Sequence, residues 1–500
     1  MPYSRVDAAS DPGRNATGQP DELGQSLAAL RTEMKLTGEF SDDVLRQAKE
    51  AVAGYQMPRA DLTHLPFVTI DPPGSTDLDQ AVFIERHRNG YRVHYAIADV
   101  PAFVAPGSAL DAETRRRGQT IYAPDTRIPL HPEAIGEDAG SLLPHQIRGA
   151  YVWEFALDDG GRLQDTWLQR ARIQSTAQLT YEEVQQDIDA GTAPEPLYLL
   201  KEVGQRRTGL ERDRGGASLA LPEQDVEHDG RRYRIDARPP LPVEEWNAQI
   251  SLLTGMAAAR IMLDGNVGIL RTMPPPHADA VSEYRRRTIA LGHPWPEGMA
   301  HGEYLRSLDT DDPEQLALMF AAATLFRGAG YTPFDGAHPE ETTQAAVAAP
   351  YAHTTAPLRR LVDRFVLPIC DAIANDRDIP QWARQALPAL PALMATSDQL
   401  ASRVERESLN AVEAAVLSSF IGQEFDCVVI STRPGSGGTV QLKEPPVTAH
   451  CEGELHTGST IRARLVSADI ARREVLFRAV DATGPDDGTG GTPAPGNDNS

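Results

Sequence analysis

Three aspartates lie close together in the segment PFVTIDPPGSTDLDQAVF. Asp71 ends the apolar run PFVTI, and Asp77 and Asp79 come just before a second run, AVFIE. A loop that folds back between two strands brings the three carboxylates toward one small volume. Such a concentration of negative charge is costly unless cations neutralise it. Hard oxygen ligands of this kind suit magnesium or manganese, so the spacing indicates a metal site.

Two other interpretations compete with a metal site in this acidic loop. An EF-hand calcium loop needs oxygen-bearing ligands, normally acids, at its third and fifth positions. Counted from Asp71, these positions hold Pro73 and Ser75, so the calcium loop is excluded. A structural turn with solvated aspartates stays open when the spacing is considered alone.

A second group of charged residues lies in the segment YAHTTAPLRRLVDRF. Thr355 is a plausible helix N-cap, and Pro357 suits the first turn of that helix. Arg359 then lies about one turn into the helix, where its guanidinium and the helix N-terminus can bind one anion together. Arg360 and Arg364 extend the basic face. The alternative is a surface helix with a solvated basic stripe.

The elements around these segments indicate an α+β fold rather than a βαβ repeat. Two short helices are predicted between residues 22 and 54, either as a helix-turn-helix or as a simple packing element. Strand patterns separated by Asn-Gly and Asp-Gly turns fill residues 65–167, and helical patterns cover residues 244–270 and 312–328.

The C-terminal part has a different pattern of predicted secondary structure. A helix is predicted over residues 396–421, followed by four or five short strands with glycine turns in about 65 residues. A small closed barrel of the OB-fold type fits this pattern and offers a face for nucleic acid. Another small β-sandwich is the alternative.

Composition places limits on the protein class. The net charge is −23, which argues against a generic nucleic-acid binder, although whole-chain charge ignores local clustering. The chain has three scattered cysteines, no apolar run long enough to cross a membrane and no signal-peptide pattern. We therefore expect a cytoplasmic protein in a reducing compartment, without a membrane association.

The acidic and basic segments together resemble a known family. The first is similar to the aspartate signature of the RNase II family catalytic domain, and the second to its arginine-bearing Thr-Ser-Pro-Ile-Arg motif. The stretches YAIADVPAFVAPGSALDAE and IYAPDTRIPLHPEA between them also resemble that domain. The resemblance covers about residues 61–400 and a C-terminal OB-fold of the ribosomal S-one type. It implies processive 3′→5′ hydrolysis of RNA to nucleoside 5′-monophosphates with two divalent metals, Mg²⁺ or Mn²⁺.

The resemblance also assigns roles to residues. Asp71, Asp77 and Asp79 match three of the four signature acids, and Asp79 matches the one regarded as essential for cleavage. Arg359 matches the arginine that stabilises charge on the scissile phosphate. The remaining residues expected to contact RNA are Tyr122, which would stack on a 3′-terminal base, Glu245, Thr355 and Arg360.

Four departures from the family pattern stand out. The fourth acid of the signature is Gln80, so that metal ligand would be a neutral carbonyl oxygen and the second metal should bind more weakly. The serine of the arginine motif is Ala356, and Leu219 is the nearest counterpart of a second stacking aromatic. A short helical segment stands where the family usually has two cold-shock OB-folds.

These observations predict five segments and one activity. The segments are a disordered leader (1–20), a helical domain (21–60), an RNB-type catalytic domain (61–405), an OB-fold (410–482) and a disordered tail (483–500). We expect a monomeric exoribonuclease that acts on single-stranded RNA without an organic cofactor. A catalytically weak RNA-binding regulator, favoured by Gln80, and a single-stranded DNA exonuclease are the alternatives.

Overall fold

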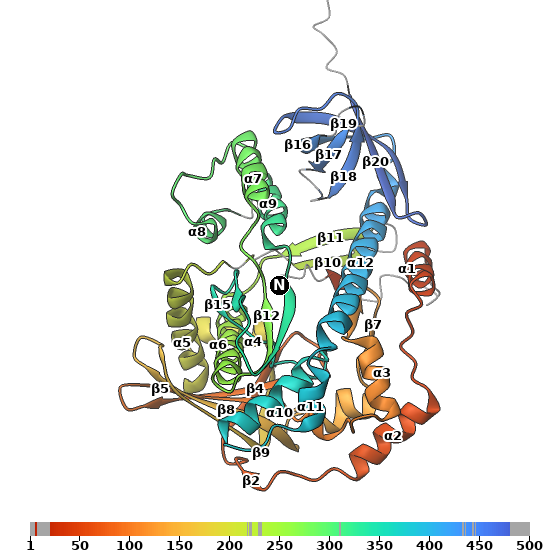
Figure 1. The fold of residues 1–500 in the computed structure, drawn as a ribbon. Helices are drawn as coiled ribbons and strands as arrows, with labels where there is room; N and C mark the ends of the chain where they lie inside the picture. The colour runs from red at the N-terminus through yellow and green to blue at the C-terminus, as the bar shows by residue number, and fades with distance from the viewer. Residues whose placement is uncertain are drawn as a thin grey trace, which may run out of the picture.

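The computed structural model describes residues 6–7, 21–217, 219, 223–228, 233–309, 312–432, 435, 437–442, 445 and 447–480. The expected tail, and all of the expected leader except strand β1 (Val6–Asp7), lie outside these residues. The chain is a mixed α+β structure with a β-barrel near its C-terminal end, as the sequence predicts (Figure 1).

A six-stranded sheet with the order β2-β9-β3-β4-β5-β8 forms the centre. β9 pairs with β8 between Leu163 and Gln174 and with β3 between Ser175 and Thr180, so the sheet curls back on itself. This pairing places Asp71, at the end of β3, beside Thr180, at the end of β9. The strands are β2 (Ala60–Asp61), β3 (Phe67–Asp71), β4 (Gln80–His87), β5 (Gly90–Ala98), β8 (Ile147–Asp158) and β9 (Leu163–Thr180).

Both faces of this sheet are buried. On β5, Val93 and Tyr95 point into one apolar cluster, whereas Ala96 and Ala98 point into another, as the two-residue period of a strand requires. The helices over the first face are α4 (Tyr181–Ala190), α5 (Glu195–Asp213), α6 (Pro242–Asp264), α10 (Asp363–Ala374) and α11 (Gln381–Ala386). The elements over the second face are α2 (Asp42–Ala53), the short helix η1 (Val100–Ala102), α3 (Ala109–Arg117) and the π-helix η2 (Ala134–Ala139).

The two N-terminal helices pack on different parts of the molecule. α1 (Glu22–Glu33) lies against α12 (Leu390–Leu417), and the Ser26 hydroxyl donates to the carbonyl of Ile470 in the barrel at 2.7 Å. α2 lies against α3 and η2 instead. These helices are therefore packing elements and not a compact helix-turn-helix.

A helical lobe is inserted between two paired strands, β12 (Val267–Thr272) and β13 (Gly330–Asp335). The helix predicted over residues 244–270 is wrong in its last part, because α6 ends at Asp264 and the apolar run after Gly265 pairs with β13. The lobe consists of α7 (Ala278–Ala290), α8 (His301–Arg306), α9 (Pro313–Ala321) and η3 (Ala322–Phe326).

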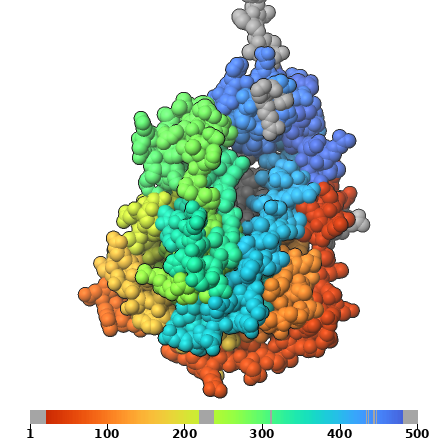
Figure 2. All heavy atoms as spheres, viewed as in Figure 1, coloured from red at the N-terminus to blue at the C-terminus, as the bar shows by residue number. Residues whose placement is uncertain are grey.

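The C-terminal barrel is closed, with the strand order β16-β17-β18-β20-β19. α12 leads into it through η4 (Ser418–Phe420), and Leu291 and Leu318 of the helical lobe pack against Val428 on its surface. Figure 2 shows a hollow between the lobe, the barrel and α12. The barrel strands are β16 (Glu424–Thr432), β17 (Gly438–Leu442), β18 (Thr448–Glu452), β19 (Thr460–Asp469) and β20 (Glu474–Ala479).

Three small sheets complete the fold. Their strands are β6 (Ile121–Ala123) with β7 (Thr126–Ile128), β14 (Thr343–Gln344) with β15 (Ala349–Pro350), and β10 (Glu223–His228) with β11 (Tyr233–Arg238) and β1. Among the described helices, none has the length and apolar character needed to cross a bilayer.

A partly buried acid lies where α12 meets the barrel. The backbone amide of Thr448 donates to the Glu413 carboxylate at 3.4 Å. Burial raises the pKa of Glu413 from 4.5 to about 8, and this hydrogen bond opposes the shift only weakly. The folded protein therefore favours the protonated acid, and stability is retained below pH 4.5 and lost as the pH rises toward 8.

We expect Glu413→Gln to raise the free energy of unfolding by about 1–3 kcal/mol more at pH 8 than at pH 5, because the amide removes the cost of ionising this site. Thermal melting at both pH values measures the difference. Glu474→Gln, at an exposed position on β20, is the control. Equal shifts of the two variants at both pH values would contradict this role of Glu413.

Candidate active site

The acidic loop begins at the end of β3. Asp71 is the last residue of that strand, and the chain turns at Pro72 with the Ser75 amide donating to the Pro72 carbonyl at 3.3 Å. Gly74 has a φ of +76°, which a residue with a side chain adopts only with strain. Burial and the neighbouring Asp77 raise the pKa of Asp71 to about 7, although Arg359 opposes the shift.

Asp77 is held by an arginine. The Asp77 carboxylate lies 2.7 Å from the Arg127 guanidinium and accepts a hydrogen bond from the Tyr122 hydroxyl at 3.3 Å. Arg127 also lies 2.6 Å from Glu137 and donates to the Thr76 hydroxyl at 2.6 Å. Tyr122 and Arg127 face each other across the β6–β7 hairpin. Hairpin register therefore brings both side chains to Asp77.

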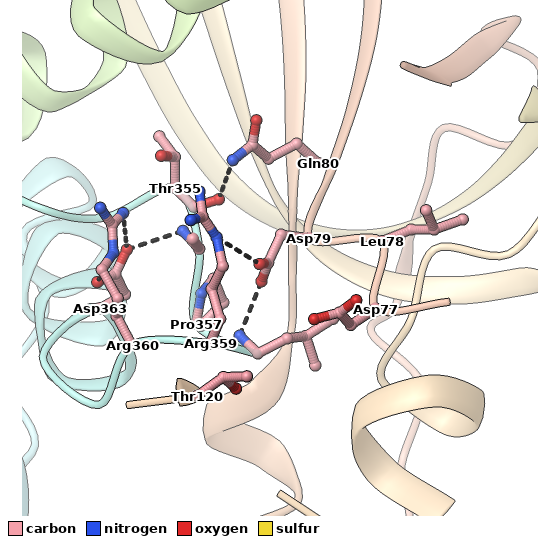
Figure 3. A network of polar contacts seen from close by, with 12 residues as sticks. Asp77, Leu78, Asp79, Gln80, Thr120, Thr355, Pro357, Arg359, Arg360 and Asp363 are labelled. Atoms are coloured by element: carbon pink, nitrogen blue, oxygen red, sulfur yellow. Dashed lines mark hydrogen bonds and ion pairs between the residues drawn. The ribbon is translucent and has the colours of Figure 1, made fainter. Parts of the chain in front are cut away.

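Asp79 is buried and contacts the arginine-bearing segment directly (Figure 3). Its Oδ1 accepts a hydrogen bond from the Leu358 amide at 2.7 Å, and its Oδ2 lies 3.7 Å from Arg359 Nε. Burial raises the pKa of Asp79 well above its ordinary value, while Arg359 and the Leu358 amide oppose that shift. The structure thus brings together two predicted residues that are 280 positions apart.

The helix predicted to begin at Thr355 is wrong. Residues 355–362 contain turns and a β-bridge at Arg360, and α10 begins only at Asp363. The Arg360 amide donates to the Ala356 carbonyl as in a helix, but neighbouring amides bind other parts of the chain. The Ala356 amide donates to Asp363 Oδ1 at 2.8 Å, the Leu358 amide to Asp79, and the Leu361 amide to the Gly118 carbonyl at 2.9 Å. Tertiary hydrogen bonds therefore override the local capping pattern.

The predicted basic face is also wrong beyond Arg359. Arg359 is exposed, with 43% of its side-chain surface open. Arg360 makes two hydrogen bonds to Asp363, at 2.7 and 3.0 Å. Arg364 is fully buried and pairs with Asp111 at 2.6 Å. A single arginine of the three thus presents its guanidinium openly beside the aspartates.

The Gln80 side chain points away from Asp77 and Asp79 (Figure 3). Its amide nitrogen donates to the Thr355 carbonyl at 2.7 Å (Figure 3). Its amide oxygen accepts from the Tyr95 hydroxyl and, at 3.3 Å, from the Ser251 hydroxyl. Both ends of the amide are therefore occupied by protein groups. Thr355, expected to contact RNA, is itself buried.

Glu245 lies on the side of α6 that faces α5, where it accepts a hydrogen bond from the Thr208 hydroxyl at 3.1 Å. It lines a pocket of about 510 Å³ between α4, α5 and α6. Two residues that sequence reasoning missed lie nearer to the aspartates: the amide of Asn247 donates to the Tyr181 hydroxyl at 3.4 Å, and burial and Asp71 raise the pKa of Tyr181. Tyr181 could have been noticed, because it directly follows the strand that ends beside Asp71.

Comparison with known families identifies the chain. A model of the RNB domain matches residues 59–374, and a model of the RNase II-type exonuclease C-terminal S1 domain matches residues 423–480. The chain belongs to the RNB-domain family. The α+β core and closed barrel are thus an RNB fold followed by an S1 barrel.

Individual RNB proteins are similar over different lengths. Ribonuclease R of Escherichia coli is 30% identical over 365 residues, which cover 69% of this chain and 42% of that protein. The chain therefore matches less than half of the length of that relative. RNase R of Mycoplasma genitalium, in complex with ribose methylated single-stranded RNA, has a TM-score of 0.81 at 19% identity and covers 93% of this chain and 79% of its own. Yeast Ssd1, described as a pseudonuclease, has a TM-score of 0.63 at 17% identity, covering 80% and 51%.

The donor set of this RNB site fits a divalent cation only in part. Among the described residues, no group of three or more His, Cys, Asp or Glu side chains is arranged to hold a metal. The Asp77 carboxylate pairs with Arg127, and the Gln80 amide is hydrogen-bonded to Thr355 and Tyr95. Asp71 and the Oδ2 of Asp79 remain as carboxylate oxygens for a cation. Two carboxylates are too few ligands for the two divalent cations that the resemblance implies.

We expect Gln80→Met to lower the free energy of unfolding by about 1–3 kcal/mol, because the Thr355 carbonyl loses its donor at nearly constant side-chain volume, while the Tyr95 hydroxyl keeps only Ser251 as a partner. Thermal melting measures the loss. Gln178→Met is the matched control, since the exposed Gln178 amide donates to the Ser75 carbonyl at the similar distance of 2.8 Å. Equal melting temperatures for both variants would show that Gln80 does not hold this segment.

Proposed function

We propose that the protein is a hydrolytic 3′→5′ exoribonuclease that shortens single-stranded RNA. The observation that carries the proposal is the meeting of the aspartates of the β3–β4 loop with an exposed arginine 280 positions later. RNB-family membership supports the reaction class, and the names ribonuclease R and RNase R of its relatives support RNA as the substrate.

Hydrolysis requires a new bond from a water oxygen to phosphorus while the bond from phosphorus to the 3′ oxygen breaks. The exposed Arg359 guanidinium can bind the phosphate and stabilise the negative charge that develops on it. A divalent cation, Mg²⁺ or Mn²⁺, held by Asp71 and Asp79 would supply further stabilisation of that charge. The backbone amide of Leu358 donates to Asp79, which keeps this carboxylate beside Arg359.

RNA can be held at two further places. Tyr122 is 37% exposed beside Asp77, where its ring can stack on a terminal base. On the barrel, Arg462, Arg464 and Arg478 are each more than half exposed on neighbouring strands. Their side chains suit contacts to a phosphate backbone. We propose roles for Glu245, Thr355 and Arg360 only in supporting the site, because their polar groups contact protein.

We propose a cytoplasmic monomer with the segment boundaries predicted from the sequence. The three cysteines are free and buried, which suits a reducing compartment. The second candidate function is RNA binding without efficient cleavage. Gln80, whose amide is committed to Thr355, and the fold shared with a pseudonuclease favour it.

The decisive experiment incubates the protein with 5′-labelled single-stranded RNA, with and without magnesium. Progressive shortening from the 3′ end supports the exoribonuclease. A gel shift without shortening supports the RNA-binding regulator, and faster shortening of a matched DNA oligomer supports the DNA exonuclease.

We expect Asp79→Asn to reduce the cleavage rate by roughly 100-fold or more while RNA binding is retained. The asparagine carbonyl can still accept from the Leu358 amide, so the segment stays in place and only the charge is lost. Rates come from the labelled-RNA assay and affinity from filter binding. Asp335→Asn, at an exposed site paired with Arg384, is the control. Cleavage at a near-native rate would remove Asp79 from the catalytic group.

We expect Tyr122→Ala to weaken the binding of short RNA by about 1–3 kcal/mol, because a stacked base loses its platform. Fluorescence anisotropy with labelled oligonucleotides of a few residues measures this. Trp167→Ala removes an aromatic ring that is 48% exposed on the central sheet and serves as the control. Equal affinities of the two variants would contradict stacking on Tyr122.

A further inference from the structure

The guanidinium of Arg127 lies against the acidic loop at Asp77. It contacts Asp77 at 2.7 Å, Glu137 at 2.6 Å and the Thr76 hydroxyl at 2.6 Å. The Thr76 hydroxyl in turn donates to Glu137 at 2.8 Å. Three acceptors converge on one guanidinium, and its fork geometry suits bidentate recognition of carboxylates.

Gln80, the first residue of β4 directly after this loop, is uncharged where the family signature has an acid. Its amide donates to the carbonyl of Thr355, a contact that a carboxylate cannot make because it has no proton to donate. Its oxygen accepts from Tyr95 and Ser251. Gln80 is thus an integral part of the packing around the Arg359 segment and does not present a free oxygen to the site.

The net charge of the site depends on both Arg127 and Gln80. The site contains the carboxylates Asp71, Asp77, Asp79 and Glu137 and the guanidiniums Arg127 and Arg359. With all of these ionised, the net charge is −2, which one divalent cation neutralises. An acid at position 80 and a neutral residue at position 127 would give −4, which two such cations would neutralise.

We propose that this site binds one divalent cation, and that Arg127 serves as a fixed internal cation in place of a second one. The inference rests on the proposed function for the role of the bound ion, although the ion count is measurable without it. Asp77 then acts as a positioning residue that anchors Arg127 and Tyr122, and not as a metal ligand.

A second cation at Asp77 would have to displace a guanidinium that has three oxygen partners. It would also place two new positive charges beside Arg127 and Arg359. Like charges repel strongly where water is partly excluded, and the side chains of Asp77 and Arg127 are only 17% and 28% exposed. The bound arginine thus lowers the affinity for a second ion by competition and by repulsion.

The test counts Mn²⁺ ions bound per chain in the absence of RNA, by the loss of the free-ion signal in electron paramagnetic resonance. The native protein is expected to saturate at one Mn²⁺. The double variant Gln80→Asp with Arg127→Met is expected to saturate at two, because it restores the fourth carboxylate and frees Asp77. Arg384→Met is the matched control, since it breaks an exposed pair with Asp335 at 2.6 Å outside the site, and should bind one.

Saturation of the native protein at two ions, or no binding at all, would overturn the inference. A double variant that melts like the native protein yet still binds one ion would also overturn it. If that variant does not fold, two other measurements decide. They are the number of Mn²⁺ ions that the native protein binds and the affinity of Arg127→Met for a second Mn²⁺, which is expected to be higher than that of the native protein. RNA cleavage is measured separately, so a native protein that binds one Mn²⁺ but leaves RNA intact contradicts the proposed function and not the ion count.

Discussion

The hydrogen bond from the Leu358 amide to Asp79 is the contact on which the site depends. It joins the last residue of the acidic loop to a segment nearly 280 residues later, and it is buried. A buried carboxylate is costly unless it is hydrogen-bonded. Because Leu358 is the neighbour of Arg359, the contact that stabilises the acid also sets the position of Arg359.

Residues 355–358 of the arginine-bearing segment are hydrogen-bonded by one neutral amide and two carboxylates. Gln80 donates to its first carbonyl, whereas Asp363 and Asp79 accept from its amides. Each partner has the polarity that the backbone group demands, and Gln80 supplies the donor for the Thr355 carbonyl. A neutral residue in an otherwise acidic signature is therefore consistent with the packing of the arginine segment, and its effect on metal binding follows from that structural role.

Sequence reasoning reached the α+β class and the closed barrel, because apolar periodicity and turn residues are local signals. It reached the meeting of the aspartates with Arg359 only through the family resemblance. It failed where tertiary contacts decide. The capping pattern at Thr355 predicts a helix, yet the amides of that turn bind Asp363, Asp79 and Gly118 instead. Arg127 was not singled out, since its importance arises only when the β6–β7 hairpin places it at Asp77.

The net charge of −23 does not indicate which parts of this chain could contact RNA. On the barrel, Arg464 and Arg478 pair with Glu424 and Glu452 on exposed strands, at 2.8 Å in both cases. Exposed pairs of this kind contribute little to stability, so a phosphate can replace the carboxylate at small cost. Within the RNB domain, Arg364 is fully buried with Asp111 and cannot make such an exchange. Exposure, and not the number of arginines, therefore decides which of them can bind RNA.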